Sequence, residues 1–346
     1  MNLPCPILLC LAALISAAGA CQICVPFPQK STADLLIDSE AVVLAREDPD
    51  RPFHLKAVEL IKGDPGMEKI DLFLDSSSRR LLRLHPESSI VVVRLVEDGK
   101  SEWRRIGMAD GEFDPLAKEI LQLAPTWKRD PRLRPRFFSK LLGHENAQLS
   151  SLAHLEVGRA PYDEIKKLGG ALSREQLRSF IGNFRYIEWH SLYILLLAQS
   201  EDERDREFIA ESLRSAERYS LTTNLAAWAT AAIELDGEMA IDSIEASYFR
   251  DPERSEKELE QIALALSVQG GSGPGALRDR IVASYGTLIA THPSMVGKVA
   301  LDLIAWKRDE LAAEIASYVA ANPRAFDFKT TLQLRAYGRQ AGARGE

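Results

Sequence analysis

The chain has 346 residues, with 43 Lys and Arg against 50 Asp and Glu, which gives a formal net charge of −7. A hydrophobic fraction of 46% and a charged fraction of 27% are typical of a soluble globular protein. These values exclude a mostly disordered chain, a collagen-like chain and a polytopic membrane protein. The acidic balance also argues against a nucleic-acid binder, which needs a concentrated basic face. At this length we expect two domains.

Residues 1–20 have the features of a signal peptide. Residues 7–18 form an apolar run that is too short to span a bilayer comfortably, and Ala18-Gly19-Ala20 has the small residues of a cleavage site. Cleavage there would make Cys21 the first residue of the mature chain, either acylated as in a lipoprotein or with a free α-amine. We therefore expect an exported protein, secreted or in the cell envelope, whose membrane contact comes only through a lipid anchor at Cys21.

The cysteines fit the same interpretation. The signal peptide would remove two of the four, leaving Cys21 and Cys24. This pair predicts a local disulfide, or a lipidated Cys21 beside a spare thiol. Thiol–disulfide exchange remains an alternative, although Pro26 and Pro28 oppose the helix that would lower the pKa of a reactive thiol. A zinc site would need four ligands, and no second pair with this spacing follows. We expect neither a metal nor a cofactor.

Residues 21–125 predict a small β domain. Short segments of strand character are separated by Gly, Pro and Asp, and Asp98-Gly99 between two of them is a strong hairpin signal. The expected strands are residues 40–46, 53–61, 69–74, 89–96 and 102–107. Five short strands in this length predict a five-stranded OB-type β-barrel, with a helix over 115–123 following it.

The opening of the predicted mature chain resembles a known family. Residues 21–29 read Cys-Gln-Ile-Cys-Val-Pro-Phe-Pro-Gln, and this run resembles the start of netrin-like modules, among them the tissue inhibitors of metalloproteinases. Residues 37–43, 53–63 and 89–96 are similar to strands of the same module. The resemblance covers the predicted β domain and implies the same barrel.

The resemblance also implies an activity. In the inhibitors, the N-terminal Cys chelates the zinc of the protease and its neighbour enters the substrate pocket, so Cys21, Gln22 and Ile23 would form the inhibitory ridge. The sequence departs from the family in two respects. The family opens with Cys-x-Cys, whereas here Cys24 follows Cys21 after two residues, and the distant cysteines that tether the opening pair are absent.

The C-terminal part predicts an all-α domain. Residues 126–135, rich in Pro, Arg and charge, are expected to form a linker, and from 136 to 340 the apolar period becomes helical. Short helices with close breaks are typical of antiparallel pairs stacked as a HEAT-like solenoid. The predicted fold class is therefore α+β with two domains. The charged run 201–207 is interpreted as the solvated start of a helix.

Catalytic motifs are incomplete in this sequence. His144-Glu145 begins like a zinc-protease motif, but Gln148 stands where the second His is required, and His190 is interpreted as a hydrogen-bonded core histidine. We therefore expect a non-enzymatic protein-binding or scaffold protein of the envelope, with a protein partner and no nucleic acid. The alternatives are a metalloprotease inhibitor acting through Cys21, and thiol–disulfide exchange through Cys21 and Cys24.

Overall fold

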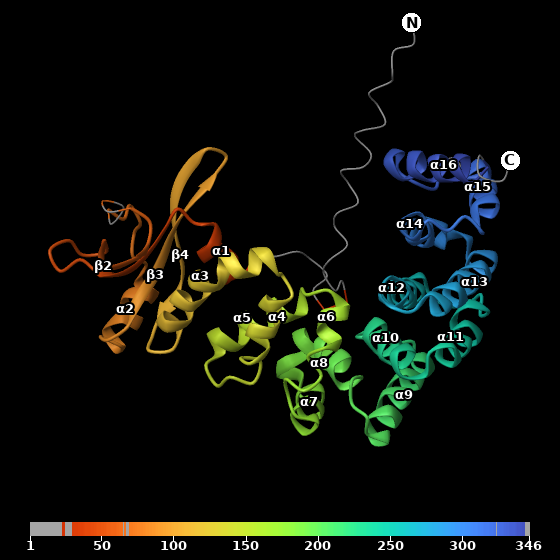
Figure 1. The fold of residues 1–346 in the computed structure, drawn as a ribbon, viewed down its shortest axis with the longest axis horizontal. Coiled ribbons are helices and arrows are strands. Elements are labelled where there is room, and N and C mark those ends of the chain that lie inside the picture. Colours follow the sequence, from red (N-terminus) through yellow and green to blue (C-terminus); the bar gives the residue numbers. More distant parts are fainter. Residues whose placement is uncertain (1–22, 25–29, 65, 67–68, 323, 343–346) are drawn as a thin grey trace, which may run out of the picture. The chain divides into compact units, whose positions relative to one another are not determined.

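The computed structural model describes residues 23–24, 30–64, 66, 69–322 and 324–342. Their contacts divide the chain into two compact units (Figure 1). We call Phe27–Val157 the sheet unit, and Gly158–Glu346 together with Met1–Pro26 the helical unit. Each unit is described by itself.

The sheet unit is built on one antiparallel sheet with the strand order β2-β1-β3-β4. Its strands are β1 (Ala41–Glu47), β2 (Leu55–Lys62), β3 (Ser89–Glu97) and β4 (Lys100–Ala109). Asp98 and Gly99 connect β3 to β4 with φ values of 51° and 76°. This left-handed pair gives the tight turn that two-residue hairpins favour, so the predicted hairpin is confirmed.

Successive side chains of β1 and β3 are apolar and buried. Since successive side chains point to opposite faces of a sheet, both faces are covered. One face packs against Ile70, Leu74 and the partly buried Leu82 of α2 (Ser76–Leu84). Elements α1 (Thr32–Asp38) and α3 (Phe113–Arg129) contact β3 and β4, respectively, and bury their own apolar side chains. The structure thus has a sheet layer between helical elements.

The expected five-stranded OB-type barrel is wrong, because the sheet has four strands and stays open. Within the described chain, the expected third strand, residues 69–74, takes part in one isolated bridge, between Phe73 and His54. Directly after it, the Asp75 carboxylate accepts a hydrogen bond from the Ser78 N–H at 2.9 Å and caps α2. Residues 69–74, which the barrel would need as a strand, and α2 instead pack on the sheet as coil and helix.

Three helices form the remainder of the sheet unit. They are α3, α4 (Leu133–Ser139) and α5 (Ala147–Gly158). Most of residues 126–135, expected as a linker, therefore belong to the end of α3 and the start of α4. The expected helix over 115–123 is present as the central part of the longer α3.

A buried ion pair joins the first and last helices of the sheet unit. Arg134 of α4 donates to both carboxylate oxygens of Glu156 in α5, at 2.8 and 2.9 Å, and to Asp34 of α1 at 2.7 Å. Glu156 has only 1% of its side chain exposed, and it also accepts a hydrogen bond from Ser31, the N-cap of α1. A single guanidinium group thereby joins α1 to two helices, α4 and α5, that lie far from it in the sequence.

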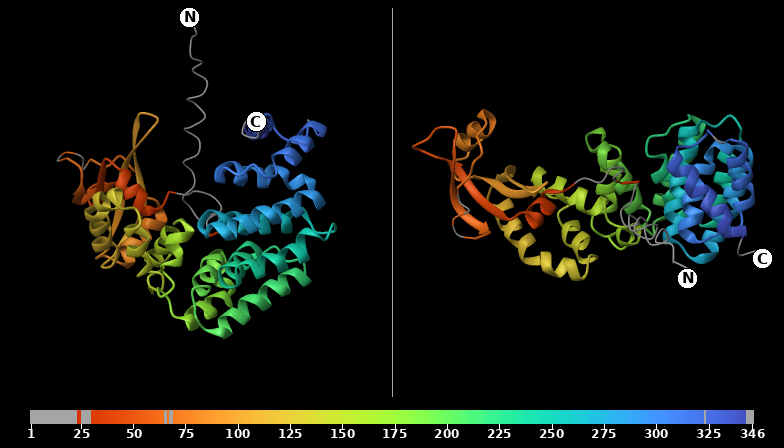
Figure 2. Two further views of the ribbon diagram at one scale, coloured as in Figure 1. Left: turned by 45° about the vertical axis from the view of Figure 1, so that its right-hand side comes forward. Right: turned by 90° about the horizontal axis from the view of Figure 1, so that it is seen from above.

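The C-terminal region is helical, as expected, and its helices form a stack. Each even-numbered helix from α6 onward contacts the next even-numbered helix, while α7, α9, α11, α13 and α15 pack against their even-numbered neighbours (Figures 1 and 2). The helices are α6 (Tyr162–Lys166), α7 (Arg174–Ile181), α8 (His190–Leu197), α9 (Glu203–Arg218), α10 (Leu225–Asp236), α11 (Glu238–Ile244), α12 (Glu256–Ser272), α13 (Gly275–Thr291), α14 (Val296–Trp306), α15 (Ala312–Ala321) and α16 (Phe328–Gly342).

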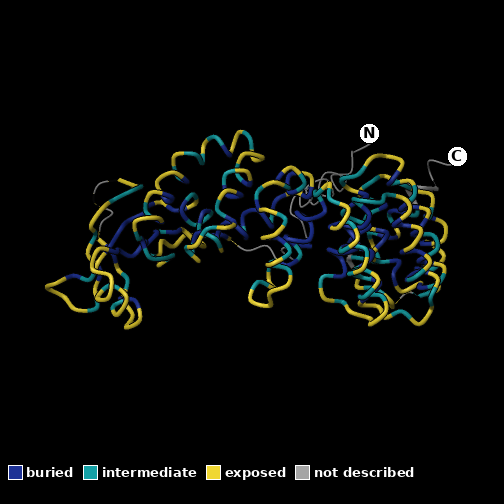
Figure 3. Tube along the Cα trace, turned by 90° about the horizontal axis from the view of Figure 1, so that it is seen from below, coloured by how far each residue is buried: buried dark blue, intermediate teal, exposed yellow. Residues whose placement is uncertain are grey.

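The core of the helical unit lies between its helices, with exposed residues on the loops and outer sides (Figure 3). Helix α10 shows why the stack is close-packed: from Leu225 to Ile233 all its residues are buried, and five of these nine are alanines that let neighbouring helices approach. Among the described residues, no helix combines the length and the apolar character needed to cross a bilayer.

The Arg134 contacts predict a large loss of stability on substitution. Arg134→Met keeps a long apolar stem but leaves the buried Glu156 carboxylate without its arginine. We expect the free energy of unfolding, measured by urea denaturation, to fall by about 3–5 kcal/mol. As a matched control, Arg104→Met removes an exposed pair with Glu97, for which we expect a change below about 1 kcal/mol. Equal losses in the two variants would contradict the role given to Arg134.

Candidate functional site

The structure describes only part of the site predicted from the sequence. Cys21 and Gln22 lie outside the described residues. Ile23 and Cys24 are buried, with 8% and 5% of their surface exposed, and they belong to the helical unit. An inhibitory ridge or a reactive thiol would need these side chains at the surface.

His190 takes the place that the sequence predicted for it. It is buried at the start of α8, and its Nε2 atom lies 3.1 Å from the backbone oxygen of Asn183. The interpretation as a hydrogen-bonded core histidine is therefore confirmed. In the part of the chain that the structure describes, no group of three or more His, Cys, Asp or Glu side chains is arranged to hold a metal ion.

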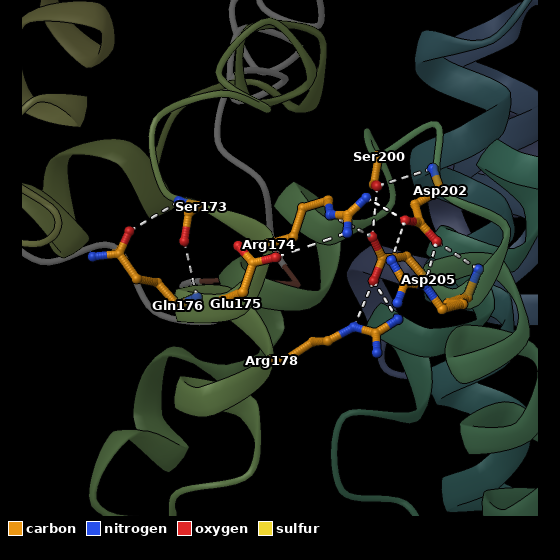
Figure 4. Close-up of polar contacts among 9 residues, drawn as sticks. Ser173, Arg174, Glu175, Gln176, Arg178, Ser200, Asp202 and Asp205 are labelled. Carbon is orange, nitrogen blue, oxygen red and sulfur yellow. Dashed lines mark hydrogen bonds and ion pairs between the residues drawn. The ribbon is translucent and has the colours of Figure 1, made fainter.

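A cluster of charged contacts joins α7 to α9 (Figure 4). Asp205, in the first turn of α9, has 1% of its side chain exposed. Arg178 donates to its Oδ1 atom from Nε at 2.6 Å and from Nη2 at 2.5 Å, while the Ser200 hydroxyl donates to Oδ2 at 2.6 Å. Arg174 Nε lies 3.6 Å from the same Oδ2 atom. The buried carboxylate is thus neutralised by two arginines.

Asp202 is the second carboxylate of this cluster and the N-cap of α9. Its side chain accepts from the Arg204 backbone N–H at 2.9 Å and from the Arg204 guanidinium at 3.0 and 3.2 Å, and it also accepts from Arg174. The hydrogen bonds from the Arg204 side chain, with those from its backbone and from Arg174, hold the pKa of the Asp202 carboxyl well below its usual range. An ionised carboxylate at this position also suits the positive end of the helix.

The local sequence explains how the cluster forms. Ser173 and Gln176 form a capping box that begins α7, and this start places Arg174 and Arg178 one turn apart on the same face. Asp202 and Asp205 are three residues apart, which places them on one side of the first turn of α9. Two arginines on one helix therefore meet two carboxylates on another.

An open recess of about 580 Å³ lies beside the cluster. Its wall includes the exposed Gly170, the partly exposed Arg174 and Gln199, and the exposed Glu201, and it is backed by the buried Leu177 and Leu196. We call it the α7–α9 recess. Gly169 is needed for the close approach of the two wall segments, because a Cβ atom there would lie 2.5 Å from the Cβ atom of Gln199. The recess offers hydrogen-bond donors, acceptors and apolar surface together.

The chemistry of this arrangement favours binding. The Ser200 hydroxyl donates to a carboxylate that two guanidinium groups already neutralise, so no free general base activates it. The charged groups serve to fix the recess, and the polar groups on its wall can contact a ligand.

Sequence reasoning missed the central residue of the cluster. The run 201–207 was expected to be a solvated helix start, which is correct for the exposed Glu201 and Glu203 but wrong for the buried Asp205. In retrospect the sequence contains a signal for this cluster: Arg174 and Arg178 are four residues apart, and Asp202 and Asp205 are three residues apart. Only the fold shows that these two pairs meet.

No protein-family model matches the chain, and comparisons with curated proteins and with solved structures give no match either. The likeness to netrin-like modules therefore rests on the sequence motifs alone.

The close approach at Gly169 predicts a selective loss of stability. In Gly169→Ala the added methyl group collides with Gln199, and we expect the free energy of unfolding to fall by about 1–3 kcal/mol. Gly170→Ala is the matched control, since no atom lies within 4 Å of the Cβ position there. Urea denaturation of both variants tests this, and an unchanged Gly169→Ala would show that the two segments are not in contact.

Proposed function

We propose that this chain is an exported, non-enzymatic protein that binds a partner protein through its helical unit, with the α7–α9 recess as a docking point. Export and a lipid anchor at Cys21 are carried over from the sequence. The alternative of metalloprotease inhibition lacks a supporting contact, because Ile23 would have to leave its buried position.

The observation that carries this proposal is that Arg174 is partly exposed on the wall of the recess. Its side chain is 40% exposed and lines the recess, and it donates one hydrogen bond, to Asp202, within the described chain. A guanidinium group has five N–H donors in a fixed plane. Its Nε and Nη2 atoms lie 3.6 Å from Asp205 and 3.8 Å from Glu175, beyond hydrogen-bond distance. The N–H groups of Arg174 that are not bonded to Asp202 can therefore donate to carbonyl oxygens of a bound peptide.

The other wall residues support a peptide over a single small ion. Glu201 is exposed and can accept hydrogen bonds from peptide N–H groups, whereas Leu177 and Leu196, each 1% exposed, only back the wall. The volume of about 580 Å³ lies in the range of ligand-binding pockets. Because Asp202 and Asp205 already balance the arginines, the recess should prefer neutral main-chain groups to a strongly charged ligand.

Photo-cross-linking tests this function. A photoreactive amino acid replaces the exposed Glu201 in the full chain, which is irradiated in its native envelope fraction, and cross-linked proteins are identified by mass spectrometry. We expect a cross-linked partner that is lost when Gly170→Trp fills the recess. Gly271→Trp is the control, because Gly271 also has no atom within 4 Å of its Cβ position but lies at the end of α12.

Two results would contradict the proposal. One is a cross-link at Glu201 that persists in Gly170→Trp. The other is a set of cross-links at Glu201 no different from that obtained at the exposed Glu256, which lies outside the recess.

A further inference from the structure

Strand β4 forms one edge of the four-stranded sheet, since it pairs with β3 and with no other described strand. The tip of the β3–β4 hairpin extends beyond the helices of the sheet unit (Figure 1). Residues 100–105 are exposed, except the partly exposed Trp103, and we call them the β4 edge. At the far end of the strand, Gln148 of α5 donates to the Met108 oxygen at 3.3 Å and covers that end.

The backbone of the β4 edge carries groups that the sheet does not use. In a two-residue hairpin the residues that flank the turn, Glu97 and Lys100, exchange backbone hydrogen bonds, and bonded pairs alternate from there. Trp103 therefore faces Arg94 in a pair without hydrogen bonds. The structure agrees, because the Arg94 oxygen accepts from the Glu40 N–H on the β1 side, at 2.8 Å. The N–H and C=O groups of Trp103 thus point away from the sheet.

The same alternation holds two residues before and two residues after Trp103. Ser101 and Arg105 also present their N–H and C=O groups outward, since the bulge of β4 begins only beyond Arg105. Within the part of the chain that the structure describes, these outward groups have no backbone partner. An exposed row of such groups is a template for pairing with another strand.

Charges on the β4 edge restrict which strand can pair with it. Glu102 and Arg104 lie on one face of β4, on either side of Trp103. Both are exposed; Arg104 has an exposed ion pair with Glu97 at 3.0 Å, whereas Glu102 has no ion pair within the described chain. When a second β4 runs antiparallel with its Trp103 opposite this one, Glu102 faces the second copy's Arg104 and Arg104 faces its Glu102. The edge is therefore complementary to itself.

This register also satisfies the backbone. It places Trp103 opposite Trp103, and Ser101 opposite Arg105 of the second copy, and these are the residues whose N–H and C=O groups point outward. Glu102 and Arg104 then form pairs without backbone hydrogen bonds, in which opposed side chains lie closest. A shift of two residues in either direction would put Glu102 opposite Glu102 or Arg104 opposite Arg104. The charges thus select one register.

We propose that two copies of this chain dimerise through their β4 edges, antiparallel about Trp103, so that the two sheets become one. Both copies use the same patch, so the contact is isologous and closes after two copies. An edge contact buries little apolar surface, and we expect a dimer in the micromolar range. The β4 edge belongs to the sheet unit, so this inference does not rest on the function proposed for the helical unit.

Charge reversal with sedimentation velocity of the full chain tests this contact. In a dimer of Glu102→Arg each new arginine faces Arg104, and in a dimer of Arg104→Glu each new glutamate faces Glu102. We expect each single variant to dimerise at least about tenfold more weakly than the wild type, because two attractive pairs become repulsive. An equimolar mixture of the two variants, and the double variant, both restore opposite charges in each pair and should regain the dimer.

The control variant lies at the opposite edge of the same sheet. Lys56 is an exposed cation of β2, so Lys56→Glu makes a charge reversal of the same size and should leave the dimer unchanged. A wild type that stays monomeric up to high micromolar concentration would overturn the inference. So would a dimer that tolerates both single variants, since it would form through another surface.

Amide hydrogen exchange locates the contact independently. The N–H groups of Ser101, Trp103 and Arg105 should exchange more slowly as the protein concentration rises, because the second copy bonds them. The Glu102 N–H is already bonded within the hairpin and should not respond. In Glu102→Arg the concentration dependence should be lost. Exchange of the three outward amides that is independent of wild-type concentration would contradict the proposed pairing.

Discussion

The buried carboxylate of Asp205 is the constraint on which the α7–α9 recess depends. Moving a charge out of water is costly, so Asp205 can be buried only if cations and hydrogen-bond donors surround it. Arg178, Arg174 and Ser200 supply them, and two of these three belong to α7. Their contacts fix α7 against α9, which in turn fixes the recess that lies beside them. Apolar packing alone would tolerate sliding between two such helices.

The same arrangement recurs at other joints of the molecule. Glu156 is held by Arg134 in the sheet unit, and Glu245 is held by Arg250 and Arg280 at the π-helical turn that follows α11. In each case a nearly buried carboxylate is paired with arginine. Because such a pair tolerates only a narrow geometry, it specifies one packing among the several that apolar surfaces would allow. The α7–α9 recess lies beside a joint of this kind.

The sequence predicts most of the local structure and little of the candidate sites. Apolar runs correctly located β1 and β3, Asp98-Gly99 located the β3–β4 hairpin, and helical periodicity located the C-terminal stack. The barrel prediction failed because residues 69–74 alternate like a strand although they fold as coil, burying Ile70 and Leu74. Asp205 was missed because burial of a charge depends on partners distant in sequence, here Arg174 and Arg178, which no local pattern reveals.

Hydrogen exchange of Asp205→Asn, compared with the wild type, tests most directly whether this carboxylate holds the site together. Asn keeps the size of the side chain but leaves Arg178 without its counter-charge, while Arg174 keeps its contact with Asp202. The account predicts amide exchange at least about tenfold faster in α7 and the first turn of α9, with α14 to α16 unchanged. Unaltered exchange in α7 and α9 would contradict it, since the recess would then keep its shape without the ion pairs.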